Sequence, residues 1–300
     1  MPSNYPLHYF LLQKSTLMIR IILTIVFISS TLCANAGGTY RNWDDALSEP
    51  QFVHTIHMTY RGMDSIPDIL DKFPNLEELN LSNNRISSLP KSLYRCKKLK
   101  RLILFRNKIT TLDNSIYQLS ALEELSISYN NLKSLPDSFG YLPSLKILIL
   151  SNNEIDSLKP DMGLLSNLTT LRLLTNQLRH IPDCIASLHS LDYLDVANNY
   201  VETITEKIGN LSNLKYLYLN KNRLNKIPAS IENCKKLYEI DVVRCGALVL
   251  PNELGKLPKL EYVYMDERTT PFYQNPIYRL RQQIIVVSPD DLLYRSSQTQ

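Results

Sequence analysis

Two histidines near the start of the chain are the first residues whose type and spacing could do chemistry. His54 and His57 lie three residues apart, and imidazole is a common zinc ligand, so the pair could hold a metal ion. A zinc-dependent hydrolase would need the arrangement HExxH, which does not follow. In a short strand here, both side chains would lie on the solvent side or at the edge. We therefore predict no metal site.

Adjacent carboxylates occur twice at equivalent places, as Glu77-Glu78 and as Glu123-Glu124. Such a pair could supply a general acid and a general base, but catalytic carboxyl groups need burial to shift their pKa values. Both pairs are interpreted as solvated edges. The motifs G-x-S-x-G, GxxxxGK[ST], GxGxxG and CxxC are also absent from the sequence. We predict no catalytic residue and no cofactor, and hence a protein that is not an enzyme.

An internal repeat determines where these side chains lie. A degenerate unit begins at Val53, and later units begin with leucines spaced at a constant interval of 23: Leu76, Leu99, Leu122, Leu145, Leu168, Leu191, Leu214, Leu237 and Leu260. A fixed period of this length indicates a solenoid, in which each unit buries its apolar side only by stacking on its neighbours.

One unit, LEELNLSNNRISSLPKSLYRCKK from Leu76 to Lys98, illustrates the elements within each repeat. Leu79 and Leu81 alternate with polar residues, which predicts a short strand with one buried face. The later apolar residues are three or four apart and predict a tight helical turn, with Pro90 at the bend.

The pattern LxxLxLxxNxLxxLPxxLxxLxx in these units resembles the leucine-rich repeat (LRR). It is similar to the repeats of bacterial exported LRR proteins and of Ras-suppressor-type LRR scaffolds, and the resemblance covers Val53 to about Arg268. It implies an α/β solenoid, a leucine-rich-repeat horseshoe with a parallel concave sheet and short helical or 3-10 turns on the convex side. We expect nine units and a terminal partial unit.

An asparagine occupies the ninth position of most units. Its amide can bond backbone groups where the strand turns away, so stacked copies predict a structural ladder without a binding role. The ladder residues are Asn84, Asn107, Asn130, Asn153, Asn176, Asn199 and Asn222. Arg61 and Cys245 take this position in the first and ninth units.

The segment before the repeats has the pattern of a secretory signal peptide. Met18–Ala36 combines Arg20, an apolar stretch from Ile21 to Leu32 and the small-residue cleavage site Ala34-Asn35-Ala36. Residues 1–36 are therefore interpreted as an over-long start plus the signal peptide. The apolar stretch is shorter than the ~20 residues of a membrane-spanning helix, so we predict an exported protein without a membrane span in the mature chain. An uncleaved anchor is the alternative.

We assign residues 37–52 to an N-terminal cap, 53–268 to the repeats and 269–300 to a C-terminal cap and tail. Both ends of a solenoid expose apolar surface and need such covers. Trp43 lies in the first cap and is interpreted as packing.

Composition excludes several functional classes. The formal net charge is only +4 over 300 residues, and no basic run exceeds two residues, so we predict no nucleic-acid partner. Cys96 and Cys234 replace core leucines, Cys245 replaces a ladder asparagine, and Cys184 falls on a variable position. Unpaired, mostly buried cysteines in an exported chain favour a bacterial origin.

The concave sheet face carries the candidate binding residues. Residues that flank the core leucines point outward, and stacking aligns them in columns. An apolar group and a C-terminal group rich in tyrosine stand out: Ile103, Phe105, Ile149, Arg172, Leu174, Tyr193, Asp195, Tyr216, Tyr218, Asp241, Tyr262 and Tyr264. Tyrosine suits protein recognition because it gives large contact area at low entropic cost. These residues could also be strand formers that stack on their neighbours.

We therefore predict a monomeric, non-enzymatic module that binds a protein or peptide through its concave face outside the cytoplasm. A cytoplasmic LRR signalling scaffold is one alternative. A cell-envelope or carbohydrate-binding protein, with the tyrosines as stacking platforms, is another.

Overall fold

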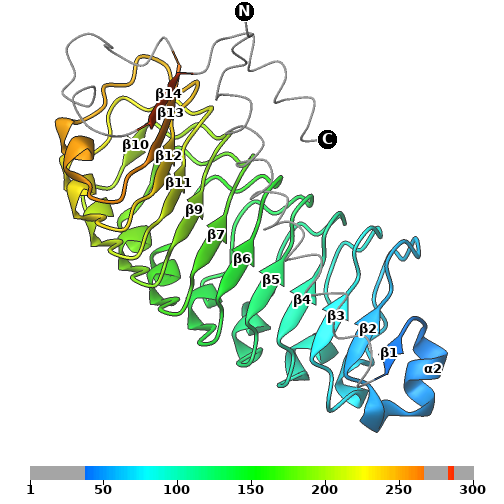
Figure 1. Ribbon diagram of the computed structural model, residues 1–300. Helices are drawn as coiled ribbons and strands as arrows, with labels where there is room; N and C mark the ends of the chain where they lie inside the picture. The colour runs from blue at the N-terminus through cyan, green and yellow to red at the C-terminus, as the bar shows by residue number, and fades with distance from the viewer. Residues whose placement is uncertain (1–37, 267–282, 287–300) are drawn as a thin grey trace, which may run out of the picture.

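The computed structural model describes residues 38–266 and 283–286, which form an elongated stack with one strand per repeat (Figure 1). Its main sheet has twelve strands, all paired in parallel. In order they are β1 (Thr39–Tyr40), β2 (Thr55–His57), β3 (Glu78–Asn80), β4 (Arg101–Ile103), β5 (Glu124–Ser126), β6 (Ile147–Ile149), β7 (Thr170–Arg172), β9 (Tyr193–Asp195), β11 (Tyr216–Tyr218), β12 (Glu239–Asp241), β13 (Tyr262–Met265) and β14 (Gln283–Val286).

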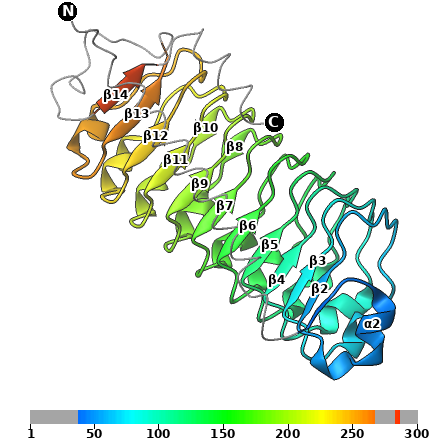
Figure 2. The ribbon, with the colours of Figure 1, turned by 45° about the vertical axis from the view of Figure 1, so that its right-hand side comes forward.

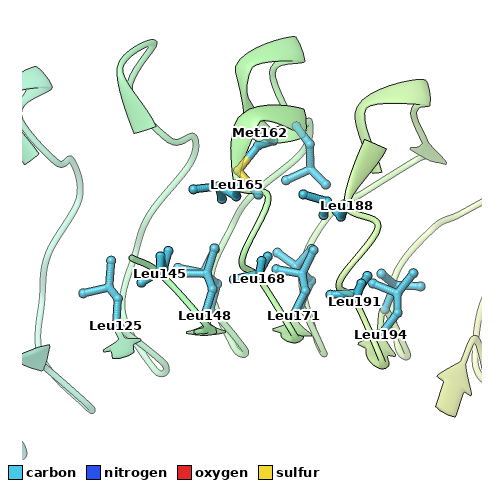
Figure 3. Close-up of a cluster of buried hydrophobic side chains, with 14 of the residues drawn as sticks. Leu125, Leu145, Leu148, Met162, Leu165, Leu168, Leu171, Leu188, Leu191 and Leu194 are labelled. Carbon is cyan, nitrogen blue, oxygen red and sulfur yellow. The ribbon is translucent and has the colours of Figure 1, made fainter. Parts of the chain in front are cut away.

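The strands of the repeats pair without any shift in register. Leu79 lies opposite Leu102, and Leu148 opposite Leu171, so each residue of β2 to β13 has as its neighbour the equivalent residue of the next repeat. The central residue of each repeat strand is apolar, most often leucine, and faces the core, where Leu148 is fully buried (Figure 3). The predicted solenoid with a parallel sheet is confirmed.

Short 3-10 helices return the chain on the other side of the core, as Figure 2 shows. They are η2 (Leu70–Lys72), η3 (Lys91–Arg95), η4 (Asn114–Gln118), η5 (Phe139–Tyr141), η6 (Pro160–Leu164), η7 (Asp183–Ser187), η8 (Ile208–Asn210), η9 (Ala229–Asn233) and η10 (Asn252–Lys256). Met162 of η6 packs with Leu165 and Leu188 into the leucine core (Figure 3). A two-stranded sheet of β8 (His180–Ile181) and β10 (Thr203–Ile204) adds to this side.

The stacking of these turns is so close that Gly140, like Gly209, has no room for a side chain. A Cβ atom built on Gly140 of η5 would lie 1.9 Å from the carbonyl oxygen of Asp161 in the next turn. The Asp161 carboxylate also accepts a hydrogen bond from the Gly140 backbone N–H, at 2.8 Å. Glycine is therefore required here by the approach of two backbones.

The asparagines of the ladder bond the backbone of their own and neighbouring repeats. Asn107 donates to the carbonyl oxygens of Leu81, 3.0 Å away, and Leu104, 3.1 Å away, and its own oxygen accepts from the Ile86 N–H at 3.0 Å. The other ladder asparagines repeat this pattern. Cys245 has only its thiol, which donates to the Leu219 carbonyl over 3.1 Å. Backbone groups that would be buried unpaired are thus satisfied.

The N-terminal end of the stack is covered by β1, by η1 (Pro50–Phe52) and by the α-helix α2 (Trp43–Ser48). The Asn42 side chain accepts from the Asp45 N–H at 2.8 Å and caps this helix. Ala46 is fully buried, and Trp43 packs against the core.

At the other end β14 pairs with β13. The predicted signal peptide, Met18–Ala36, and most of the predicted C-terminal cap lie outside the described residues. No helix in the described part of the chain has the length and apolar character needed to cross a membrane.

Candidate functional site: the concave face

The candidate site lies on the outward face of the main sheet, where the strand fixes each side chain. In β11 the core leucine Leu217 is almost fully buried, while Tyr216 and Tyr218 on either side of it are half-buried and face outward. Because the strands are in register, outward residues at equivalent positions lie beside each other, about 4.8 Å apart from strand to strand. Contacts on this face are therefore contacts between different repeats.

An ionic cluster occupies the N-terminal part of the face. Glu78 of β3 lies between His57 of β2, with Nε2 at 2.6 Å from Oε1, and Arg101 of β4, with Nε at 2.8 Å from Oε2. The Glu78 side chain is only 4% exposed. Burial disfavours its charged form, but the hydrogen bonds from His57 and Arg101 outweigh burial and lower the pKa of Glu78. The interpretation of Glu78 as a solvated edge residue is therefore wrong.

The other residues of the predicted acid pairs behave differently. Glu77 lies on the edge, 2.7 Å from Lys100, and Glu123 lies 3.0 Å from Lys146, both in exposed ion pairs that link neighbouring repeats. Glu124 is half-buried on the concave face, where burial raises its pKa. The alternation of strand side chains separates the two members of each pair.

The two histidines also have different partners. His54 lies 3.7 Å from Glu77 on the edge, whereas His57 belongs to the cluster around Glu78. Across residues 38–266, no three His, Cys, Asp or Glu side chains are grouped as metal ligands.

The middle of the face carries several apolar side chains. The predicted residues Ile103, Phe105, Ile149 and Leu174 are half-buried on the neighbouring repeats of β4 to β7. Phe105 contacts Tyr129 edge-on, with ring centroids 5.2 Å apart. Ser126, Ser128 and Ser151 occupy outward positions of the same repeats and are buried.

Six tyrosines form a continuous chain of ring contacts across β9 to β13, which we call the tyrosine strip. The rings of Tyr193 and Tyr218 are 5.3 Å apart, and those of Tyr193 and Tyr216 are 6.0 Å apart. Beyond them, the contacts run from Tyr216 to Tyr238 at 6.0 Å, from Tyr238 to Tyr262 at 5.4 Å and from Tyr262 to Tyr264 at 6.4 Å.

Tyr238 is the member of the strip that sequence reasoning missed. In the outward columns the acids of β12 separate the tyrosines of β11 from those of β13, but Tyr238 joins them by ring contacts on both sides. It directly precedes β12, at the second position of its unit. Equivalent residues such as Lys100, Asp192 and Lys215 are charged. An aromatic residue at a position that is charged in most other repeats was the available signal.

The acids within the strip are less available than their place in the columns suggested. Asp195 and Asp241 are buried, and each accepts a hydrogen bond of 3.0 Å from the backbone N–H two residues later. Burial raises the pKa of Asp195 to about 6. Glu239 is half-buried and accepts from the Tyr218 hydroxyl at 3.0 Å.

The ends of the strip are set by two further predicted residues. Arg172 of β7 stacks over Tyr193, with its guanidinium carbon 4.7 Å from the ring centroid, so the strip begins with a cation–π contact. At the other end Tyr264 is buried with Val243 and the half-buried Tyr262. Tyr193, Tyr216, Tyr218, Tyr238 and Tyr262 therefore supply the partly exposed surface of the strip.

Comparisons with known proteins agree with this architecture. The family described as leucine rich repeat matches residues 97–155 and 143–201, and its shorter forms match 74–117 as two copies and 213–234 as one. These matches cover half of the chain. No curated protein matches the chain in sequence.

Solved structures with the same fold come from bacteria and plants. A Leptospira interrogans LRR protein has 23% identity and a TM-score of 0.61 over 86% of this chain and 80% of its own. The LRR ectodomain of the Arabidopsis thaliana receptor kinase GASSHO1/SCHENGEN3, in complex with Casparian strip integrity factor 2, has 24% identity and a TM-score of 0.66. That match covers 79% of this chain and 30% of the receptor.

A third structure, the PEPR1–AtPEP1 complex, is 31% identical, with a TM-score of 0.59 over 84% of this chain and 41% of the matched chain. This chain thus spans less than half of either matched chain in the two complexes. At under 25% identity, the likeness to the first two structures concerns the fold alone.

Proposed function

Because this chain belongs to the leucine-rich repeat family, we propose that it is a non-enzymatic module that binds a protein or peptide on its concave face. The tyrosine strip is the observation that carries the proposal. The leucine core needs only the inward residues of each strand, so six contacting tyrosines on the outward face exceed what the solenoid requires. Large, rigid amphipathic rings are the side chains most enriched where proteins recognise each other.

The structural neighbours support this class of function. Two of the matched LRR structures are complexes, one with Casparian strip integrity factor 2 and one with AtPEP1. An LRR solenoid offers a long, pre-formed surface. Such a surface suits an extended ligand because the solenoid loses little conformational freedom on binding.

The partner should carry apolar and basic groups. The half-buried Ile103, Phe105 and Ile149 offer apolar contact in the middle of the face. The strip adds aromatic rings beside the half-buried Glu239, which favours Lys or Arg in the ligand through ion pairing and cation–π contacts. The buried carboxylates of Asp195 and Asp241 accept hydrogen bonds from backbone N–H groups and are therefore less accessible to a ligand than Glu239.

We place this activity outside the cytoplasm, with the mature chain beginning at Gly37. The support is the sequence pattern of Met18–Ala36. N-terminal sequencing of exported material checks the site of cleavage, and an intact N-terminus in a cytosolic fraction would instead favour the scaffold alternative.

A pair of tyrosine substitutions tests the binding surface. The partner is first isolated on the immobilised full chain and identified, and its affinity for the double variant Tyr216→Ala/Tyr218→Ala is then measured. We expect normal folding, because both side chains face away from the leucine core, and a loss of binding of ~2 kcal/mol or more, as is typical of aromatic hot spots.

The matched control is Tyr141→Ala on the convex side, where the ring is 61% exposed. It should leave affinity unchanged. Full affinity in the folded double variant would rule out the tyrosine strip as the site. Retention of a glycan instead of a protein would assign the strip to carbohydrate stacking.

A further inference from the structure

The loops that follow the strands form a second regular surface, at the sheet edge opposite the 3-10 turns (Figure 1). Each loop contains a non-glycine residue with a φ between 52° and 59°, at the same place in every repeat: Tyr60, Asn83, Arg106, Tyr129, Asn152, Thr175, Asn198, Lys221 and Arg244. The residues two positions later form a parallel row: Gly62, Arg85, Lys108, Asn131, Glu154, Gln177, Tyr200, Arg223 and Gly246. We call these two rows the loop edge.

Positive charge is concentrated on the loop edge. Its charged residues are Arg85, Arg106, Lys108, Lys221, Arg223 and Arg244, against one acid, Glu154. The formal net charge of the whole chain is only +4. Elsewhere in the described part of the chain, many cations are neutralised by an acid of the adjacent repeat, as in the Lys100–Glu77, Lys146–Glu123 and Lys215–Asp192 pairs. Most of the net positive charge of the chain therefore lies on the loop edge, whereas positive and negative charges elsewhere nearly cancel.

Two arginines at equivalent places of this edge differ in whether an acidic side chain neutralises them. Arg85 contacts Asp64, with Nε 2.8 Å from Oδ1, and also donates to the Gly62 carbonyl oxygen at 2.8 Å. Arg223 lies six repeats later and stacks on Tyr200 instead, with its guanidinium carbon 5.0 Å from the ring centroid. Glu202 takes the place of Asp64 there, but no Arg223–Glu202 ion pair forms within 4 Å. The C-terminal guanidinium is thus held in place without being neutralised.

Arg223 belongs to a compact basic cluster. Lys221 and Arg244 occupy equivalent positions of adjacent loops, about 4.8 Å apart along the stack, and all three side chains are exposed. Within residues 38–266, none of the three forms an ion pair within 4 Å with an acidic side chain. Next to Arg223 in its row stands Gly246, where a Cβ atom would meet nothing within 4 Å. The Asp266 carboxylate lies beside the cluster but accepts from the Arg244 backbone N–H, 2.6 Å away, and not from its guanidinium. The three cationic groups are therefore open to an external anion.

Exposed aromatic rings accompany the cations on this edge. Tyr60 is 78% exposed, Tyr129 46% and Tyr200 45%. These three make up a third of the exposed large apolar side chains in the described residues. Tyrosine together with Lys and Arg is the combination that anchors proteins at the headgroup level of a membrane, because the ring is amphipathic and the cations meet phosphate.

We propose that the loop edge docks on an anionic phospholipid surface, with Lys221, Arg223, Arg244 and Tyr200 as its main contact. The second pair of cations, Arg106 and Lys108, lies on the same edge five strands away, or about 24 Å at the strand spacing. A single small anion cannot reach both groups, whereas a planar array of headgroups can. Docking by this edge leaves the concave face free for its own ligand.

Vesicle binding by the full chain tests the proposal. Binding to vesicles of equal parts phosphatidylcholine and phosphatidylglycerol is compared with binding to vesicles of pure phosphatidylcholine. Binding through the apolar stretch Ile21–Leu32 contributes to both measurements, so it cancels when the two are compared. We expect preferential binding to the anionic vesicles, weakened about a hundredfold in the triple variant Lys221→Gln/Arg223→Gln/Arg244→Gln. Tyr200→Ala should weaken it severalfold.

The control variant neutralises Lys72, Lys91 and Lys235, which are exposed and lie off the loop edge. It removes the same net charge and should retain most of the binding. Equal losses in the two triple variants would show attraction by net charge alone and overturn the proposal. It would also be overturned by equal binding to both kinds of vesicle, or by retention on a sulfated polysaccharide without vesicle binding.

Discussion

Glu78 and Tyr216 occupy the same position of their repeats, six strands apart on one sheet, yet their surroundings differ. Glu78 bonds His57 on one side and Arg101 on the other, so its charge is satisfied within the protein. Tyr216 contacts the rings of Tyr193 and Tyr238, and its own ring stays half-exposed. The scaffold places both side chains identically.

The difference teaches that the role of a residue on the concave face depends on the side chains of the repeats on either side of it. Charges that find partners across the repeats form a closed network that stabilises the N-terminal half. Aromatic rings satisfy one another only in part, because rings such as those of Tyr193, Tyr216 and Tyr218 stay partly exposed. The N-terminal half thus contributes to stability, and the C-terminal half offers contact area.

The largest expected effect tests the scaffold that the two halves share. Leu148 is fully buried in the middle of the stack, and Leu148→Ala should lower the free energy of unfolding by ~2–5 kcal/mol through the cavity it leaves. Thermal and urea unfolding measure this loss.

The control is Lys159→Ala, which removes only an exposed ion pair with Asp137 and should cost less than ~1 kcal/mol. Equal losses for the two variants would contradict the assigned register and, with it, the comparison of equivalent positions.

The next prediction concerns the ionic half. Glu78→Gln should cost about 1.5–3 kcal/mol at neutral pH, because it replaces a buried carboxylate that pairs with the Arg101 guanidinium and bonds the His57 ring. The pKa of Glu78 is lowered on folding, so its contribution is present above its unfolded pKa of about 4.3 and is lost as pH falls through the folded value. The gap in stability between wild type and variant should therefore close in acid.

Unfolding in urea at a series of pH values checks this, with Tyr216→Ala as the counterpart from the other half. The tyrosine variant should change stability little and show no such pH dependence. A gap for Glu78→Gln that is constant with pH would mean that the cluster is not ionic in the way described.

The smallest effect has the opposite sign and sharpens the account of the tyrosine half. Asp195 is buried, and burial raises its pKa to about 6, so the fold loses stability as pH rises from the unfolded pKa of about 4, and the loss is complete above about 6. Asp195→Asn should stabilise the protein by roughly 2 kcal/mol at pH 7, and the gain should vanish as pH falls below about 4. Asparagine keeps the acceptor oxygen.

Asn80 shows that the substitution fits, because it occupies the equivalent position in β3 and accepts from the Ser82 N–H at 3.0 Å. The free energy of unfolding measured at pH 4 and pH 7 for both proteins tests the prediction. Destabilisation at pH 7 would indicate that the Asp195 carboxylate is held by a stronger partner than the backbone N–H.

The fold was predictable because its information is local and repeated. Alternation around Leu79 and Leu81 predicts a strand, and the constant interval between units predicts the parallel register seen for Leu79 and Leu102. The asparagine ladder followed from the same reasoning, since every repeat must satisfy the same backbone groups. The outward columns were predictable too, because the side chains of a strand alternate between its faces.

The contacts within the candidate site were less predictable. The burial of Glu78 depends on His57 and Arg101, which belong to the repeats on either side of it. Tyr238 joins the strip although it lies outside the strand columns, because a long ring reaches the neighbouring repeats on both sides. Side-chain length and direction are not contained in the periodicity.

The sequence by itself therefore determined the family of the fold, the element order and the face on which each residue lies, since periodicity and alternation are properties of a single chain. Only the tertiary structure decided which of the outward groups neutralise one another and which remain available. That outcome depends on the distances and burial between side chains of different repeats. Arg85 and Arg223 illustrate this. Both are arginines at the same position of their repeats, but Arg85 contacts a carboxylate and Arg223 contacts an exposed ring.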